Sequence, residues 1–279
     1  MAYHIAVDSC TDRTPSMKED KNITLVPLTL IVGEERIVDD DTFNQAEFLR
    51  KVAASPDAPS SACPSPDAYM QAFGYDSEDA YGITLSAELS GSYNSAKLAA
   101  DLLKEEFPEK RIHVFNSCSA SAGQTLILLK LQECLAAGKN FEEVVKEVEH
   151  YISEQTTLFV LESLETLRKN GRLTGLKATL VNVLNIKPVM SSTPEGTIQQ
   201  LDMGRGMKKA LAKMVEHIGK NVIHPTEKIL AIAHCNCLER AKWVKVEVEK
   251  HYAFKEVIIV DTAGVATMYA NDGGIVVAF

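Results

Sequence analysis

The sequence has no long hydrophobic run and no excess of positive charge. No stretch approaches the ~20 apolar residues of a membrane-spanning helix, and the first residues, MAYHIAVDSC, lack the basic segment and apolar run of a signal peptide. The net charge is -9, and the clustered Lys and Arg side chains that bind nucleic acid phosphates are missing. We therefore expect a cytoplasmic protein that does not bind nucleic acid.

The common signatures of nucleotide, hydrolase and zinc sites are also absent. No segment reads GxGxxG, GxxxxGK[ST], GxSxG or HExxH. The six cysteines form no CxxC pair, and their scatter is typical of a reducing compartment. His234, Cys235 and Cys237 lie close together in HCNC, but neighbouring strand residues point to opposite faces and no second ligand pair is near. We expect no metal and no cofactor.

Strand-like and helix-like segments alternate along the chain, which is 46% hydrophobic. This pattern predicts an α/β fold with a largely parallel sheet in its first part. The strands are expected at 4–7, 23–31, 81–85, 112–115, 157–161, 228–233 and 257–260. The helices are expected at 45–53, 65–73, 92–107 and 122–137. Asn140 and Glu143 form a capping pair for a further helix, which leads into a second unit. We predict two α/β domains, at residues 1–153 and 154–279.

Two loops rich in hydroxyl groups are the most informative feature of the sequence. They read SSACPSPDAY at 60–69 and LSAELSGSYNSA at 85–96, and each lies between a predicted strand and a helix. Ser90 or Ser92 is expected to cap the helix that follows the second loop. A helix start offers unpaired N–H groups and a positive dipole end, so these loops suit a carboxylate or phosphate. Ordinary helix capping would explain any single serine equally well.

Six segments in a fixed order resemble the DegV family of fatty-acid-binding proteins. They are VDSCTD, SSACPSP, LSAELSGSYNSA, VFNSCSASAGQ, LETLRKNGRLTG and LNIKPVMSSTPEGTIQQLDMGRGMKKAL, and together they span nearly the whole chain. The resemblance implies two α/β domains of the DegV type with a lipid site near their junction. The ligand would be a long-chain fatty acid such as palmitate, stearate or oleate. The resemblance also implies that the protein is the lipid-presenting subunit of a fatty acid kinase and is not itself an enzyme.

The resemblance also assigns ligand-binding roles. Ser61 matches the hydroxyl residue that contacts the carboxylate, Ser90 matches a second carboxylate-binding hydroxyl, and the Gly91 N–H is its neighbour. Arg172 matches the arginine of a GGR element, which either orients the polar end of the site or ties loops together. Tyr269 stands where the family usually has a histidine at the mouth of the lipid site.

The sequence departs from the family pattern at three places. Cys63 replaces a glutamine in the first hydroxyl loop, and Met207 replaces the second arginine of a pair whose first member is Arg205. The C-terminal motif reads TMYANDGGIV, with Asn271 and Asp272 in place of Gly-Pro, beside Tyr269. This last departure puts head-group recognition and docking of the kinase in question.

Two other functions are consistent with the same loops. One is a Ser- or Cys-dependent hydrolase, which needs a histidine base near Ser90 or Cys118, although none of the seven histidines lies in a family motif. The other is a sensor of a small anion. For the lipid-binding hypothesis, the cavity walls are expected from the apolar runs 23–32, 126–131 and 180–184. Lipid exchange would then involve transient contact with a membrane.

Overall fold

The first half of the chain is built around a parallel sheet. The computed structural model describes residues 3–74, 77–173 and 185–279. The sheet has four strands in the order β2-β1-β6-β7, all parallel to one another. Its strands are β1 (Tyr3–Asp8), β2 (Ile23–Val26), β6 (Asp79–Thr84) and β7 (Arg111–Asn116). Every residue of β6 is buried, as expected for a parallel strand that is covered on both faces. The predicted parallel sheet is confirmed.

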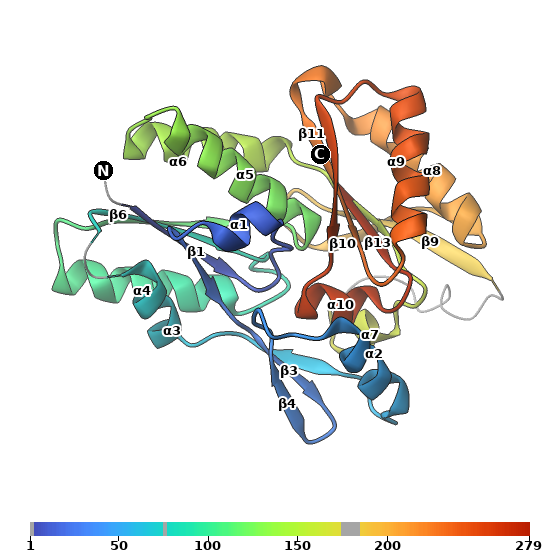
Figure 1. Ribbon diagram of the computed structural model, residues 1–279, viewed down its shortest axis with the longest axis horizontal. Helices are drawn as coiled ribbons and strands as arrows, with labels where there is room; N and C mark the ends of the chain where they lie inside the picture. Colours follow the sequence, from blue (N-terminus) through green and yellow to red (C-terminus); the bar gives the residue numbers. More distant parts are fainter. Residues whose placement is uncertain (1–2, 75–76, 174–184) are drawn as a thin grey trace.

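Helices cover both faces of this sheet (Figure 1). One face carries α3 (Pro66–Phe73) and α4 (Ser92–Glu106), and the other carries α5 (Ala122–Ala136) and α6 (Phe141–Glu154). The predicted capping pair of α6 is confirmed: the Asn140 side chain accepts from the Glu143 N–H, and the Glu143 side chain accepts from the Asn140 N–H, each at 3.0 Å. The short helix α1 (Pro15–Glu19) follows β1.

The second half contains a mixed sheet of six strands in the order β10-β9-β8-β13-β11-β12. Only β11 and β12 pair in parallel. The strands are β8 (Thr157–Val160), β9 (Ile186–Ser192), β10 (Ile198–Arg205), β11 (Ile229–His234), β12 (Glu256–Asp261) and β13 (Ile275–Ala278). The helices α8 (Met207–Asn221) and α9 (Leu238–His251) pack on one face, and the 3-10 helix η2 (Pro225–Glu227) precedes β11.

Helix α5 lies between the two large sheets. Ile127 and Leu128 pack with strands of the first sheet, whereas Ala122 and Leu126 pack against β11 and the end of β13. A helix in this position buries apolar side chains on two opposite sides, and its exposed or partly exposed polar residues, Lys130, Gln132 and Glu133, lie toward its C-terminal end. Because α5 belongs to both layers, the predicted domain boundary at residue 153 stays a prediction.

A small antiparallel sheet, in the order β4-β3-β5, extends below the first sheet in Figure 1. Its strands are β3 (Thr29–Val32), β4 (Glu35–Val38) and β5 (Ser60–Ala62). The helices α2 (Gln45–Ala54), α7 (Glu165–Lys169) and α10 (Gly264–Ala270) lie beside it. The single strand predicted at 23–31 is therefore wrong, because Pro27 separates β2 from β3 and the two strands enter different sheets.

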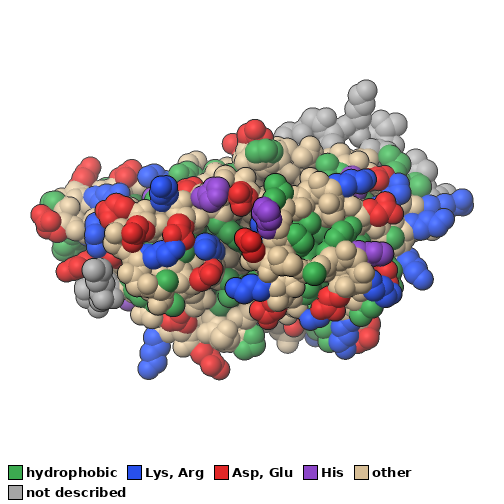
Figure 2. Space-filling view, turned by 90° about the horizontal axis from the view of Figure 1, so that it is seen from above, with side chains coloured by type: hydrophobic (Ala, Val, Ile, Leu, Met, Phe, Trp, Pro, Cys, Tyr) green, Lys and Arg blue, Asp and Glu red, His purple; other side chains and the backbone are tan. Residues whose placement is uncertain are grey.

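The surface has the mixed charge that the composition implies. Figure 2 shows Lys and Arg side chains interspersed with Asp and Glu over the face that is seen from above. Within the described residues, no helix is long and apolar enough to cross a membrane.

Candidate functional site

An apolar cavity lies where the loops of the first sheet meet the second sheet and α10. Its unfilled space, including the opening to solvent, is about 750 Å³. The apolar part of its lining comes from the β6–α4 loop, the β7–α5 loop, β8, β10, β13 and helices α7 and α10. These residues are Leu85, Leu89, Ala120, Phe159, Leu161, Leu167, Ile198, Val265, Ala266, Ala270 and Val276. Such a lining suits a ligand with a long hydrocarbon part.

Tyr269 and Arg172 also line the cavity, together with five hydroxyl residues: Ser119, Ser121, Thr157, Ser192 and Thr197. Burial raises the pKa of the Tyr269 hydroxyl, and the positive charge of Arg172 and the side chain of Ser61 oppose this increase. The Tyr269 hydroxyl therefore lies close to both. Three of the predicted residues are therefore close together: Ser61 of β5, Arg172 of the segment after α7, and Tyr269 of α10.

Arg172 is fixed by backbone oxygens on either side. Its Nε donates to the Leu89 carbonyl at 3.0 Å, and its Nη1 donates to the carbonyl of Asn170. Asn170 in turn donates from Nδ2 to the Pro59 carbonyl at 2.9 Å. Arg172 thus ties the segment after α7 to the second hydroxyl-rich loop, and Asn170 ties it to the residue that precedes the first. Because Arg172 also lines the cavity, it can in addition orient the head group of a ligand.

The two hydroxyl-rich loops touch at Gly91. A Cβ atom added to Gly91 would lie 3.0 Å from the Cys63 Sγ, so the absence of a side chain lets the loops approach. The prediction that Ser90 or Ser92 is the N-cap of α4 is wrong, because Gly91 occupies that position. The Ser90 Oγ instead accepts from the N–H of Ser92 at 3.2 Å. Ser61, Ser90 and Gly91 lie beside the cavity rather than in its lining.

The prediction for the cavity walls was wrong for two of its three segments. Residues 23–32 do not line the cavity, and residues 126–131 lie in α5 between the sheets. The third segment, 180–184, lies outside the described residues. Arg205 is exposed at the end of β10 and does not line the cavity.

Three buried aspartates, Asp8, Asp12 and Asp39, hold segments that contribute to the cavity lining, and none of them was among the predicted ligand-binding residues. Asp8 accepts from the Leu85 N–H at 2.7 Å and from the Gln124 side chain at 2.8 Å. Burial raises the pKa of Asp8 to about 6, of Asp12 to about 7 and of Asp39 to about 6. Asp8 is the last residue of β1, Asp12 lies four residues beyond it, and Asp39 directly follows β4, so all three lie at or after the end of a strand of the first half.

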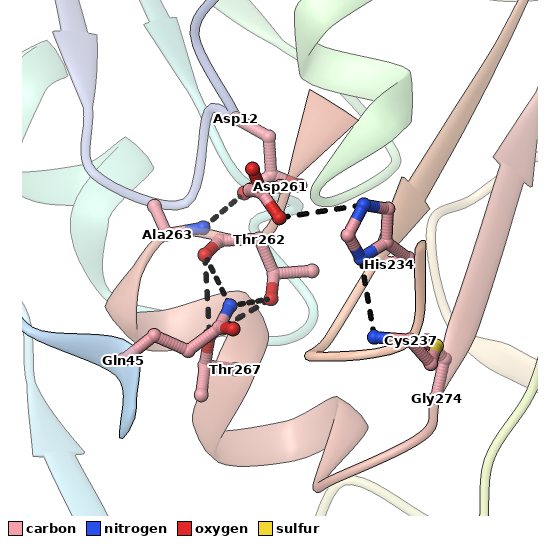
Figure 3. A network of polar contacts seen from close by, with 9 residues as sticks. All are labelled: Asp12, Gln45, His234, Cys237, Asp261, Thr262, Ala263, Thr267 and Gly274. Atoms are coloured by element: carbon pink, nitrogen blue, oxygen red, sulfur yellow. Dashed lines mark hydrogen bonds and ion pairs between the residues drawn. The ribbon is translucent and has the colours of Figure 1, made fainter. Parts of the chain in front are cut away.

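The HCNC segment forms a hydrogen-bonded corner rather than a ligand cluster (Figure 3). The His234 Nδ1 accepts from the Cys237 N–H at 3.4 Å, and its Nε2 lies 3.3 Å from the Asp261 Oδ1. Cys237 Sγ donates to the Gly274 carbonyl at 3.5 Å. Across the described ranges, no group of three or more His, Cys, Asp or Glu side chains is placed to hold a metal ion.

Fold and site together define an α/β protein with a mostly apolar cavity whose lining includes Tyr269 and Arg172. The sequence matches the family described as "Uncharacterised protein, DegV family" over residues 2–279. A DegV domain-containing protein of Streptococcus gordonii is 34% identical over 281 residues, which cover 100% of this chain and 99% of that protein. The chain therefore belongs to the DegV family, and the resemblance drawn from the six motifs is confirmed.

Two solved structures of the family are similar over the whole chain. A DegV family protein from Ruminococcus gnavus, solved with vaccenic acid, is 54% identical, with a TM-score of 0.97 and coverage of 100% of both chains. The fatty acid kinase B3 protein of Streptococcus pneumoniae, solved with linoleic acid, is 32% identical, with a TM-score of 0.92 and coverage of 100% of this chain and 99% of that one. Both are fatty-acid-loaded proteins of the fold described here.

Proposed function

We propose that this protein binds one long-chain fatty acid, with the acyl chain in the apolar cavity and the carboxylate at its mouth. The observation that carries this proposal is a cavity with a mostly apolar surface whose lining also contains Tyr269 and Arg172. Burial of a CH₂ group stabilises by about 0.8 kcal/mol, so a sixteen-carbon chain contributes on the order of 12 kcal/mol before the costs of ordering and desolvation. The acyl chain thus supplies most of the affinity.

The carboxylate needs hydrogen-bond donors when it leaves water. We propose that Ser61, Ser90, Tyr269 and the Gly91 N–H donate to it, with Arg172 supplying a positive charge nearby. This assignment is supported by the closeness of Ser61, Arg172 and Tyr269 and by the contact of the two loops at Gly91. Charge-assisted hydrogen bonds of this kind are stronger than neutral ones and fix the orientation of the ligand.

We propose further that the protein presents the bound carboxylate to a separate fatty acid kinase and does not catalyse a reaction itself. The similarity to the kinase B3 protein of Streptococcus pneumoniae supports a kinase partner. Burial raises the pKa of both Cys10 and Cys118, so neither thiol is activated as a nucleophile. This counts against a cysteine nucleophile in the hydrolase alternative. The apolar lining counts against the small-anion sensor, since a small polar ligand would leave most of the cavity unsolvated.

In this role the protein would act in the cytoplasm, where six free cysteines persist as thiols. It would contact the membrane only during lipid exchange.

Mass spectrometry of lipid extracted from the purified protein tests the binding proposal. We expect a fatty acid of about sixteen to eighteen carbons at near-stoichiometric amount. After the lipid is removed, the protein should bind added palmitate or oleate in a calorimetric titration. A protein that carries no lipid and binds neither acid would refute the proposal, and binding of inorganic phosphate or acetate in its place would favour the small-anion sensor.

A further inference from the structure

The corner that leads into α10 is held by carboxylates from the other half of the chain. Asp39 follows β4 and is 2% exposed. Its Oδ1 accepts from the Gly264 N–H at 2.7 Å and its Oδ2 accepts from the Val265 N–H at 2.8 Å. Asp12 accepts from the preceding N–H, that of Ala263, at 2.6 Å (Figure 3). Three successive backbone donors of this corner therefore point at two buried carboxylates.

Gly264 is required for this contact. A Cβ atom added there would lie 2.4 Å from the Asp39 Oδ1 and 2.8 Å from a methyl carbon of Leu30. Both distances are too short for any side chain, so the Asp39 carboxylate can approach the helix only where residue 264 has none. The contact of Asp39 with the helix therefore depends on a glycine at position 264, although the two residues are far apart in the sequence.

Helix α10 connects this corner to the cavity. Val265 and Tyr269 are four residues apart, so they share one face of the helix, and both line the cavity. On the same helix, Met268 packs with Leu28 and Leu30 of the first half. A shift or rotation of the first turn of α10 would therefore move the Tyr269 hydroxyl relative to Ser61 and Arg172.

We infer that Asp39 is a positioning residue, which holds the first turn of α10 so that Tyr269 stays in place for the fatty acid carboxylate. This inference rests on the proposed function. Asp39 does not touch the ligand and acts through the helix. Its charge is stabilised by the two N–H groups and by the side chain of Ser9. An amide in its place presents an NH₂ group to one of these N–H donors, so one of the two hydrogen bonds is lost.

The test compares Asp39→Asn with the parent protein loaded with oleate that carries ¹³C at its carboxyl carbon. We expect the variant to release oleate about tenfold faster, which corresponds to the loss of one hydrogen bond to a charged group. The ¹³C resonance of the bound carboxyl should also shift, because the donors around it move. Gly264→Ala should produce both changes by displacing Asp39, and it provides a second route if Asp39→Asn does not fold.

Asp79→Asn is the matched control. Asp79 is also buried, accepts from Arg111 Nε at 2.7 Å and begins β6 at the end away from the cavity loops. It should lower the melting temperature and leave the release rate and the resonance unchanged. An Asp39→Asn variant that loses stability but keeps the parent's rate and resonance would overturn the inference, as would equal changes in the control. If the parent itself binds no oleate, the proposed function fails instead.

Discussion

The side chain of Ser61 interacts with the hydroxyl of Tyr269, a cavity-lining residue, and opposes the effect of burial on the tyrosine pKa. Ser61 belongs to β5 of the small antiparallel sheet, and Tyr269 belongs to the last helix of the chain. The head-group site is therefore assembled by contact between the two halves. Neither half contains the whole site.

Replacing either loop serine should weaken lipid binding. We expect Ser61→Ala and Ser90→Ala each to cost about 1 to 3 kcal/mol of binding free energy, the usual loss for a hydrogen bond to a charged group. Titration of the lipid-free variants with oleate measures this cost. Ser65→Ala is the control, since Ser65 lies in the first loop but only caps α3, accepting from the Ala68 N–H at 3.2 Å. Equal affinities for all three variants and the parent would show that the serines only shape their loops.

Tyr269 should change how the head group is handled rather than whether lipid is held. A tyrosine hydroxyl donates a hydrogen bond but stays neutral at pH 7, and burial raises its pKa further. We expect Tyr269→His to retain oleate and to be phosphorylated faster by a fatty acid kinase whose own binding proteins carry histidine there. Acyl-phosphate formation with one kinase preparation measures this.

The role of Asp272 can be tested separately with the same acyl-phosphate assay. Asp272 is exposed and accepts from the Asn236 side chain at 3.0 Å, so its negative charge faces solvent three residues beyond Tyr269. We expect Asp272→Asn to increase turnover, because it removes a charge that repels an anionic nucleotide. If the fatty acid bound to the parent is phosphorylated at full rate, or if neither substitution increases that rate, the differences from the family pattern at Tyr269 and Asp272 have no effect on phosphorylation.

The sequence predicts the first sheet and its helices well, because parallel strands and amphipathic helices have strong local patterns. It predicts the cavity walls poorly. Leu128 and Ile198 are both apolar, yet Leu128 packs between α5 and the first sheet while Ile198 lines the cavity. Only tertiary packing separates a core residue from a wall residue. The residues at the mouth could be named because family motifs identify them, not because periodicity does.

The buried aspartates illustrate the same limit. Asp39 and Asp40 are neighbours, and both follow β4. Asp40 is at the surface and accepts from the Thr42 N–H at 2.8 Å, a common turn, whereas Asp39 points inward to α10. Nothing local distinguishes the two, since the partner of Asp39 lies at the other end of the chain.

Removal of the lipid should destabilise the protein. A ligand that binds only the folded state stabilises it by RT ln(1 + [L]/Kd), which is about 2.7 kcal/mol at one hundred times Kd. We expect the melting temperature to fall after delipidation and to recover with added oleate in a concentration-dependent way. Octanoate, which fills less of the cavity, should restore less stability at equal concentration. Identical melting curves with and without lipid would contradict binding to the folded state.

The buried aspartates should make stability depend on pH. Burial raises the pKa of Asp12 to about 7, above its ordinary value of 3.8, so the folded state holds this proton more tightly than the unfolded state does. The stabilisation is complete below about pH 4 and is lost as the pH rises to about 7. We expect Asp12→Asn, which stays neutral, to gain on the order of 2 to 4 kcal/mol relative to the parent between pH 5 and pH 8. Urea unfolding at several pH values measures this difference.

The comparison between parent and variant is needed because other groups titrate as well. Burial lowers the pKa of His234, so its contribution to stability has the opposite sign and is lost as the pH falls below about 6.5. Asp202, whose pKa is lowered to about 2 by Lys213, contributes a change only below about pH 4. The difference between the unfolding free energies of the parent and Asp12→Asn cancels the titration of Asp202, and it reports Asp12 together with the two carboxylates that interact with it, Asp39 and Asp261. A difference that stays constant from pH 5 to pH 8 would mean that the Asp12 carboxyl is already ionised at pH 5 in the folded protein, which would contradict the raised pKa.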